Sequence, residues 1–127
     1  MERRARLCAT LLAALSVAAT GAGAATLDTP VLATIVTTDH VACSILNVGS
    51  KPIEAVIQLR DSGGGSVLEE LTVTVHPSTR QAMVNTVGTL GATSFYCHFE
   101  IKGGKKKVRA NLSIGDNRTD MTTAVAY

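Results

Sequence analysis

Hydrophobic and polar residues alternate with a period of two in the second half of the chain. The pattern is clearest in residues 93–102, TSFYCHFEIK, and returns in residues 106–114, KKVRANLSI. Because successive side chains of a β-strand point to opposite faces, it predicts two strands that each bury one face. Gly103 and Gly104 between them are typical of a tight turn, so we expect the two strands to pair as a hairpin. The inward set is Phe95, Cys97, Phe99 and Ile101, then Val108, Ala110, Leu112 and Ile114.

The same pattern predicts a second hairpin upstream, formed by residues 53–60 and 67–75 around the glycine-rich segment 61–66. Glu69 falls on the inward face of its second strand, which indicates a late start or a shift of register. Seven or eight short strands with frequent turn signals favour an all-β fold, a single antiparallel β-sandwich or a barrel. The remaining strands are expected at residues 32–38, 41–48 and 80–87, with an edge strand or a loose end at 121–126.

The first residues have a different character. Arg3, Arg4 and Arg6 precede an uncharged run at residues 7–19, and small residues at Ala22 and Ala24 follow it. This order predicts a helical secretory signal peptide at residues 1–24. We expect cleavage after Ala24, and cleavage after Ala25 is the second choice. The alternative is a membrane anchor, but a span needs about 20 apolar residues. We therefore expect a mature domain at residues 25–127 without a transmembrane segment, exported by the general secretory route to the periplasm or the outside.

Removing the predicted signal changes the charge. The full chain has 12 basic and 10 acidic residues, and residues 1–24 contain three of the basic ones and one acidic one, Glu2. Nine of each remain in residues 25–127. Aromatic residues make up only 3% of the chain. A neutral domain with few stacking side chains argues against a nucleic-acid partner.

Removing the predicted signal also changes the number of cysteines. Cys8 lies inside the predicted signal, which leaves Cys43 and Cys97. An even pair in an exported domain predicts a disulfide, because free thiols are a hazard in an oxidising compartment. The closed loop would stabilise the fold by about 4 kcal/mol in the chain-entropy estimate.

A turn motif lies in residues 43–64, CSILNVGSKPIEAVIQLRDSGG. Asn47 can cap a turn with its side chain, Gly49 can adopt positive φ, and Pro52 can start the next strand. With Asp61, these residues resemble the Asn-x-Gly-x-x-Pro…Asp run of small exported bacterial immunoglobulin-like β-sandwich proteins of unassigned function. The resemblance implies an immunoglobulin-like sandwich and no particular activity.

The most conspicuous charges are in one basic segment, composed of Lys102, Lys105, Lys106, Lys107 and Arg109. One interpretation is an anion-binding hairpin for an acidic polysaccharide or the carboxylates of a partner protein. The other, which the sequence favours, is a solvated hairpin whose lysines protect a sheet edge from unwanted pairing.

No catalytic motif stands out, and we predict neither a cofactor nor a metal. His40, His76 and His98 lack the short paired spacing of zinc or copper sites. The leading hypothesis is a non-catalytic binding or structural module of the cell envelope or secretome. An assembly or adhesion protein that joins partners by edge-strand pairing is the alternative, favoured by the β-rich carboxyl terminus. A small secreted enzyme or metal carrier that uses the three histidines is the second alternative.

Overall fold

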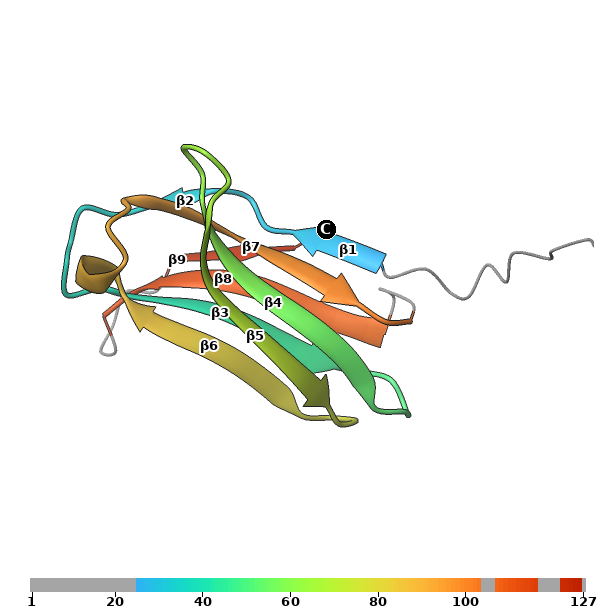
Figure 1. The fold of residues 1–127 in the computed structure, drawn as a ribbon. Coiled ribbons are helices and arrows are strands. Elements are labelled where there is room, and N and C mark those ends of the chain that lie inside the picture. The colour runs from blue at the N-terminus through green and yellow to red at the C-terminus, as the bar shows by residue number, and fades with distance from the viewer. Residues whose placement is uncertain (1–24, 104–106, 117–121, 127) are drawn as a thin grey trace, which may run out of the picture.

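The computed structural model describes residues 25–103, 107–116 and 122–126. These residues form short strands and one turn of 3-10 helix (Figure 1). The helical turn, η1 (Val87–Thr89), directly follows the sixth strand. The strands are β1 (Ala25–Asp28), β2 (Leu32–Ala33), β3 (His40–Asn47), β4 (Ile53–Asp61), β5 (Val67–Val75), β6 (Arg80–Thr86), β7 (Ser94–Ile101), β8 (Val108–Gly115) and β9 (Thr122–Val125).

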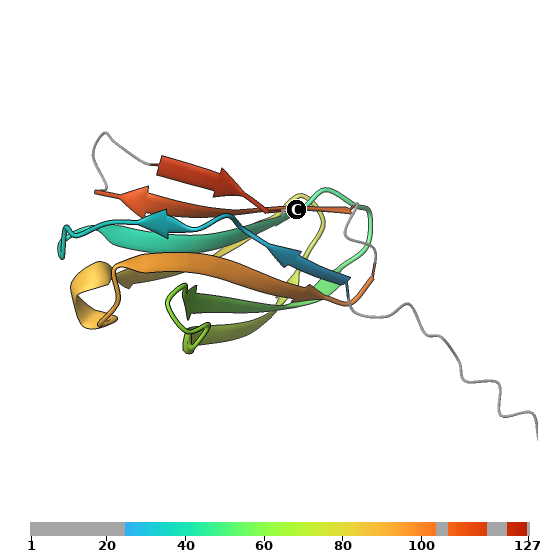
Figure 2. The same ribbon diagram turned by 90° about the horizontal axis from the view of Figure 1, so that it is seen from above.

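The strands form two sheets that pack face to face (Figure 2). The first sheet has the order β1-β7-β4-β5, with β2 also paired to β7, and the second has the order β6-β3-β8-β9. Every pairing between described strands is antiparallel. The prediction of an all-β sandwich is therefore confirmed.

The core lies between the sheets and is built from the alternating positions of the central strands. On β7, Phe95, Cys97, Phe99 and Ile101 are all fully buried, as the alternation predicted. Leu112 on β8 faces them from the second sheet and is also fully buried. Aliphatic side chains supply most of the remaining core, so the fold depends on close packing of branched residues between sheets about 10 Å apart.

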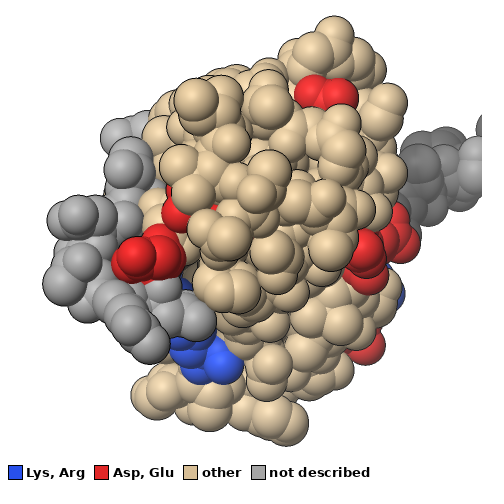
Figure 3. Space-filling view, turned by 90° about the vertical axis from the view of Figure 1, so that its left-hand side faces the viewer, with Lys and Arg blue, Asp and Glu red and all other residues tan. Residues whose placement is uncertain are grey.

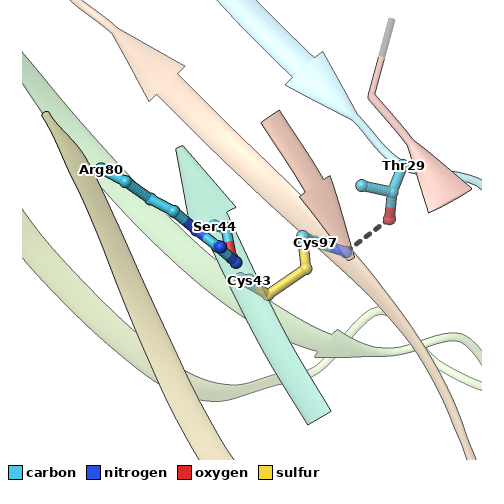
Figure 4. The surroundings of a disulfide bond; sticks show 5 residues. All are labelled: Thr29, Cys43, Ser44, Arg80 and Cys97. Atoms are coloured by element: carbon cyan, nitrogen blue, oxygen red, sulfur yellow. Dashed lines mark hydrogen bonds between the residues drawn. A yellow bond between two sulfur atoms is a disulfide. The ribbon is translucent and has the colours of Figure 1, made fainter. Parts of the chain in front are cut away.

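A disulfide joins the sheets through the core. Cys43 on β3 bonds to Cys97 on β7, with 5.8 Å between the Cα atoms, and this confirms the predicted pair. Thr29 lies against the same point of β7 (Figure 4). Its hydroxyl accepts a hydrogen bond from the Cys97 amide at 2.9 Å, and its own amide donates to the Cys97 carbonyl at 3.0 Å. Thr29 thus continues the ladder of β1 by one residue before Pro30, which has no amide donor, interrupts it.

The predicted hairpin between residues 93–102 and 106–114 is wrong in its pairing, although both strands exist. β7 pairs with β1 and β4 in the first sheet, and β8 pairs with β3 and β9 in the second. A glycine pair indicates that the chain reverses, but a reversal can cross between sheets as readily as it can return beside the same strand. Residues 104–106 of this connection lie outside the described residues.

The other predicted hairpin, β4 with β5, is confirmed, including the irregularity signalled by Glu69. The register shifts after the pair Leu59–Glu69, because Arg60 is opposite Val67. Leu68 is left without a partner of its own in the ladder and packs against the core. The shift is a β-bulge that turns an apolar side chain inward at the end of an edge strand.

The first predicted strand, residues 32–38, is wrong in extent. Only Leu32 and Ala33 pair, and β1 upstream was not predicted. The Thr34 hydroxyl accepts from the Val36 amide at 3.1 Å and donates to the Asp39 carboxylate at 2.8 Å. These local bonds give the backbone an alternative to the sheet, so the strand ends at Ala33.

Candidate functional site

The two outer faces of the sandwich differ in their polar groups. On the first sheet, several charged groups are paired with one another or with amides. Lys102 bonds to Glu54 at 2.9 Å, and His98 Nδ1 lies 2.6 Å from the Asp28 carboxylate. Arg60 donates to Gln58, whose amide donates to Glu70 at 2.6 Å. These contacts pair several side chains of a face on which acidic residues outnumber basic ones.

The second sheet presents two arginines in one row of its outer face. Leu46 on β3 is directly opposite both Arg80 on β6 and Arg109 on β8. Directly opposed residues in an antiparallel ladder point to the same side. Neighbouring strands lie about 4.8 Å apart, so the two arginine backbones are separated by about 10 Å across β3. The register therefore brings together two cations that are 29 positions apart in sequence.

The next row of this face contains short polar side chains. Ser44 is 3% exposed although it points away from the core, because the longer Arg80 reaches across it. The Arg80 guanidinium donates to the Ser44 hydroxyl at 2.6 Å, and Figure 4 shows this side chain crossing from β6 to β3. Asn111 is opposite Ser44 on β8, and its buried Oδ1 atom has no hydrogen-bond partner. Polar groups thus gather beside the arginines.

These residues surround a hollow of about 330 Å³ on the outer face of the second sheet. In the described part of the chain, no carboxylate lies within ion-pair distance of Arg80. Two guanidinium groups beside a hydroxyl form an arrangement suited to a carboxylate, sulfate or phosphate group, because all three can donate hydrogen bonds to it. We call this set the arginine hollow; its residues are Ser44, Ile45, Leu46, Arg80, Arg109, Ala110, Asn111 and Val125.

The predicted basic segment is divided by the fold. Lys102 is bonded to Glu54 of the first sheet, whereas Arg109 lies on the outer face of the second. Lys107 is exposed beside the turn that contains Gly49, and Lys105 and Lys106 lie outside the described residues. The described members therefore do not form one cluster. Sequence reasoning missed Arg80, because only the register of β3 with its neighbours links it to Arg109.

The turn motif has a structural role. The side chain of Asn47, fully buried, donates to the carbonyls of Lys51 at 2.7 Å and Val75 at 2.9 Å, and accepts from the Gly49 amide at 2.9 Å. Asp61 closes the next turn in the same way, accepting from the Gly63 amide at 2.8 Å. Both side chains cap turns, as expected for these residue types.

The expected positive φ at Gly49 is wrong: in the described chain the glycines with positive φ are Gly65, Gly91 and Gly103. Gly49 is needed for space, since an added Cβ would lie 3.1 Å from the Lys107 Cβ and 3.2 Å from Asn47 Oδ1. Pro52 precedes β4, which begins at Ile53.

The histidines lie apart. His40 begins β3 in the second sheet, His76 follows β5, and His98 is on the outer face of the first sheet. Among residues 25–103, 107–116 and 122–126, no three histidine, cysteine or acidic side chains are grouped as metal ligands would be. Nor does this part of the chain contain a helix long and apolar enough to cross a membrane.

The end of the sandwich that contains η1 and the loop between β2 and β3 has a different surface. Figure 3 shows that most of this end bears neither basic nor acidic side chains. Ile35 in the loop is 87% exposed, and Val36 is also exposed. A hollow of about 370 Å³ lies beside the loop, between Leu32, Asp39 and Ile114 among others. Its lining combines apolar side chains with the carboxylates of Asp39 and Asp116, and the Asp39 carboxylate accepts a hydrogen bond from the Thr34 hydroxyl.

No protein-family model matches the sequence, and no curated protein is significantly similar to it. Among solved structures, the fold resembles the crystal structure of Thermotoga maritima 1070. The TM-score is 0.53 with 17% sequence identity, over 83% of this chain and 94% of that chain. At this identity the likeness concerns the fold, and a β-sandwich does not by itself specify a function.

Proposed function

We propose that this chain is an exported, non-catalytic binding module whose ligand presents an anionic group to the arginine hollow. The observation that supports it most is the row Arg80–Leu46–Arg109, in which the register of β3 with both neighbours places two arginines on one outer face. A bidentate guanidinium contact with a carboxylate or sulfate is stronger and more specific than a contact with lysine. An acidic polysaccharide, with regularly repeated anionic groups, is the ligand class that we favour.

Several features support export. The amino-terminal charge pattern is that of a secretory signal, and Ala25, the residue after the predicted cut, is paired with Ile101 in β1. The disulfide fits an oxidising compartment. We therefore propose removal of residues 1–24 and residence in the periplasm or outside the cell. We further propose the immunoglobulin-like class, since the disulfide links central strands of two opposed sheets, as it does in those domains.

The binding proposal is tested with residues 25–127 and two probes, polygalacturonate and dextran sulfate, by isothermal titration calorimetry. We expect saturable binding of at least one polyanion that weakens as salt is added, because exposed charges are screened. The double variant Arg80→Gln and Arg109→Gln should weaken this binding at least tenfold, since hydrogen bonds to charged groups contribute about 1.5–3 kcal/mol each.

The matched control is Arg60→Gln, which removes one positive charge from the other outer face, where Arg60 contacts Gln58. The affinity of this control for the polyanion should stay within about twofold of that of the unmodified domain. Because the double variant removes two charges and the control one, a control that loses half as much binding free energy as the double variant, or more, would mean that net charge alone drives binding, and this would contradict a site. Absence of polyanion binding would also contradict the proposal.

A further inference from the structure

β6 forms one edge of the second sheet, and Figure 1 shows no described strand beyond it. Two backbone bonds fix which of its groups face β3: the Asn47 amide donates to the Thr79 carbonyl at 3.1 Å, and the Val87 amide donates to the Asp39 carbonyl at 2.9 Å. Both pairs belong to the register of β3 with β6, and bonded pairs recur at every second residue of an antiparallel ladder. The amide and carbonyl groups of Ala82 and Val84 therefore point away from the sheet.

The other described edges are protected against pairing. β1 and β2 are separated by a break that contains Pro30, β5 has a bulge and two adjacent glutamates, Glu69 and Glu70, and β9 has four residues. Bulges, prolines, charges and short length are the common devices that prevent association of sheet edges. β6 has seven residues, a continuous register and, apart from Arg80 at its first position, no charge.

The sequence of β6 is compatible with pairing to itself. If two copies meet antiparallel about a two-fold axis at Met83, Ala82 of each copy lies opposite Val84 of the other. Each such pair exchanges both of its outward backbone bonds, so the four central bonds are made at once. Arg80 falls opposite Thr86 and about 20 Å from the second Arg80, so no like charges face each other.

The side chains also fit this register. Val84 is 57% exposed and Ala82 is exposed, and both lie on the outer face of the second sheet. Pairing places each valine beside an alanine of the other copy, which removes apolar surface from water. We propose that β6 is the contact of a symmetric homodimer in which two four-stranded sheets join into one of eight strands. This proposal is independent of the arginine hollow.

Sedimentation equilibrium of residues 25–127, over a concentration series without polyanion, tests it. We expect a reversible monomer–dimer equilibrium. Ala82→Pro removes an outward amide donor while leaving every β3–β6 bond intact, a position where edge strands tolerate proline. The variant removes two of the four central bonds of the dimer, so the dissociation constant should rise about tenfold or more.

A second variant covers the case in which proline disturbs the strand. Val84→Lys keeps the backbone and places two ammonium groups on diagonal positions of the dimer, so it should also raise the dissociation constant about tenfold or more.

The control Thr72→Lys adds the same charge to an exposed position of β5 and should leave the monomer–dimer equilibrium unchanged. Arg80→Gln with Arg109→Gln, the variant that tests anion binding, should still form dimers. A monomer at every concentration, or a dimer unaffected by Val84→Lys, would overturn the proposal.

Discussion

Asn47 and Asp61 perform the same local task in different surroundings. Each accepts a hydrogen bond from the amide two positions ahead, with 2.9 Å at Asn47 and 2.8 Å at Asp61. Asn47 is fully buried and also donates to the carbonyls of Lys51 and Val75. An aspartate cannot make these donations, because an ionised carboxylate only accepts. The buried turn therefore requires an amide, whereas the exposed turn requires only an acceptor.

Exchanging the two residue types tests this difference. Asn47→Asp should lower the free energy of unfolding by about 3 kcal/mol or more, because a buried charge would face two carbonyl oxygens. Asp61→Asn keeps the acceptor in an exposed turn and should change the free energy of unfolding by less than about 0.5 kcal/mol. Urea denaturation at neutral pH measures both. Similar losses for the two variants would contradict the role assigned to the amide.

At the scale of elements, β3 and β7 organise the sandwich. Each is a central strand of its own sheet, and the disulfide joins them across the core. The two cysteines are 54 positions apart in sequence, and the segment between them contains β4, β5 and β6. Closing this loop restricts the unfolded chain far more than it restricts the folded one. The strongest effect of the bond is therefore expected on global stability.

Replacing both cysteines with alanine should lower the free energy of unfolding by about 4 kcal/mol, in the chain-entropy estimate for this loop length. Guanidinium chloride denaturation of residues 25–127 provides the measurement. Dithiothreitol should destabilise the parent domain by a similar amount and leave the double-alanine variant unchanged. A parent domain whose midpoint does not move on reduction would argue against this role of the disulfide.

For the whole molecule, the charge balance depends on whether residues 1–24 are present. The full chain has a sequence pI of about 8.6, whereas residues 25–127 contain equal numbers of basic and acidic residues. An almost neutral domain has little electrostatic repulsion between copies, which is compatible with association through an edge strand.

Removal of residues 1–24 would therefore change the isoelectric point of the chain. Protein recovered from the periplasm or medium should focus near neutral pH under denaturing conditions, and its intact mass should correspond to a chain that begins at Ala25. The matched control is the full chain produced in the cytoplasm, which should focus near pH 8.6. An exported form that retains the basic pI would show that residues 1–24 are kept.

The sequence by itself determined the features that depend on interactions within a short segment or on residue counts. The period of two identified the inward side chains of β7 and β8, because strand alternation is a property of a short segment. Cysteine parity after the predicted signal gave the correct disulfide. Asn47 and Asp61 were predicted to be turn residues, since their side chains act on the adjacent backbone.

The tertiary structure decided which strands lie side by side. Turn signals show where a chain reverses and not which sheet it enters, so the separation of β7 from β8 was not predictable. Two findings depend on the register of β3 with its neighbours. One is that Arg80 and Arg109 lie in the same row, and the other is which backbone amide and carbonyl groups of β6 point away from the sheet. Register is set by packing against distant segments. For that reason the candidate binding hollow and the unprotected edge became visible only in the folded molecule.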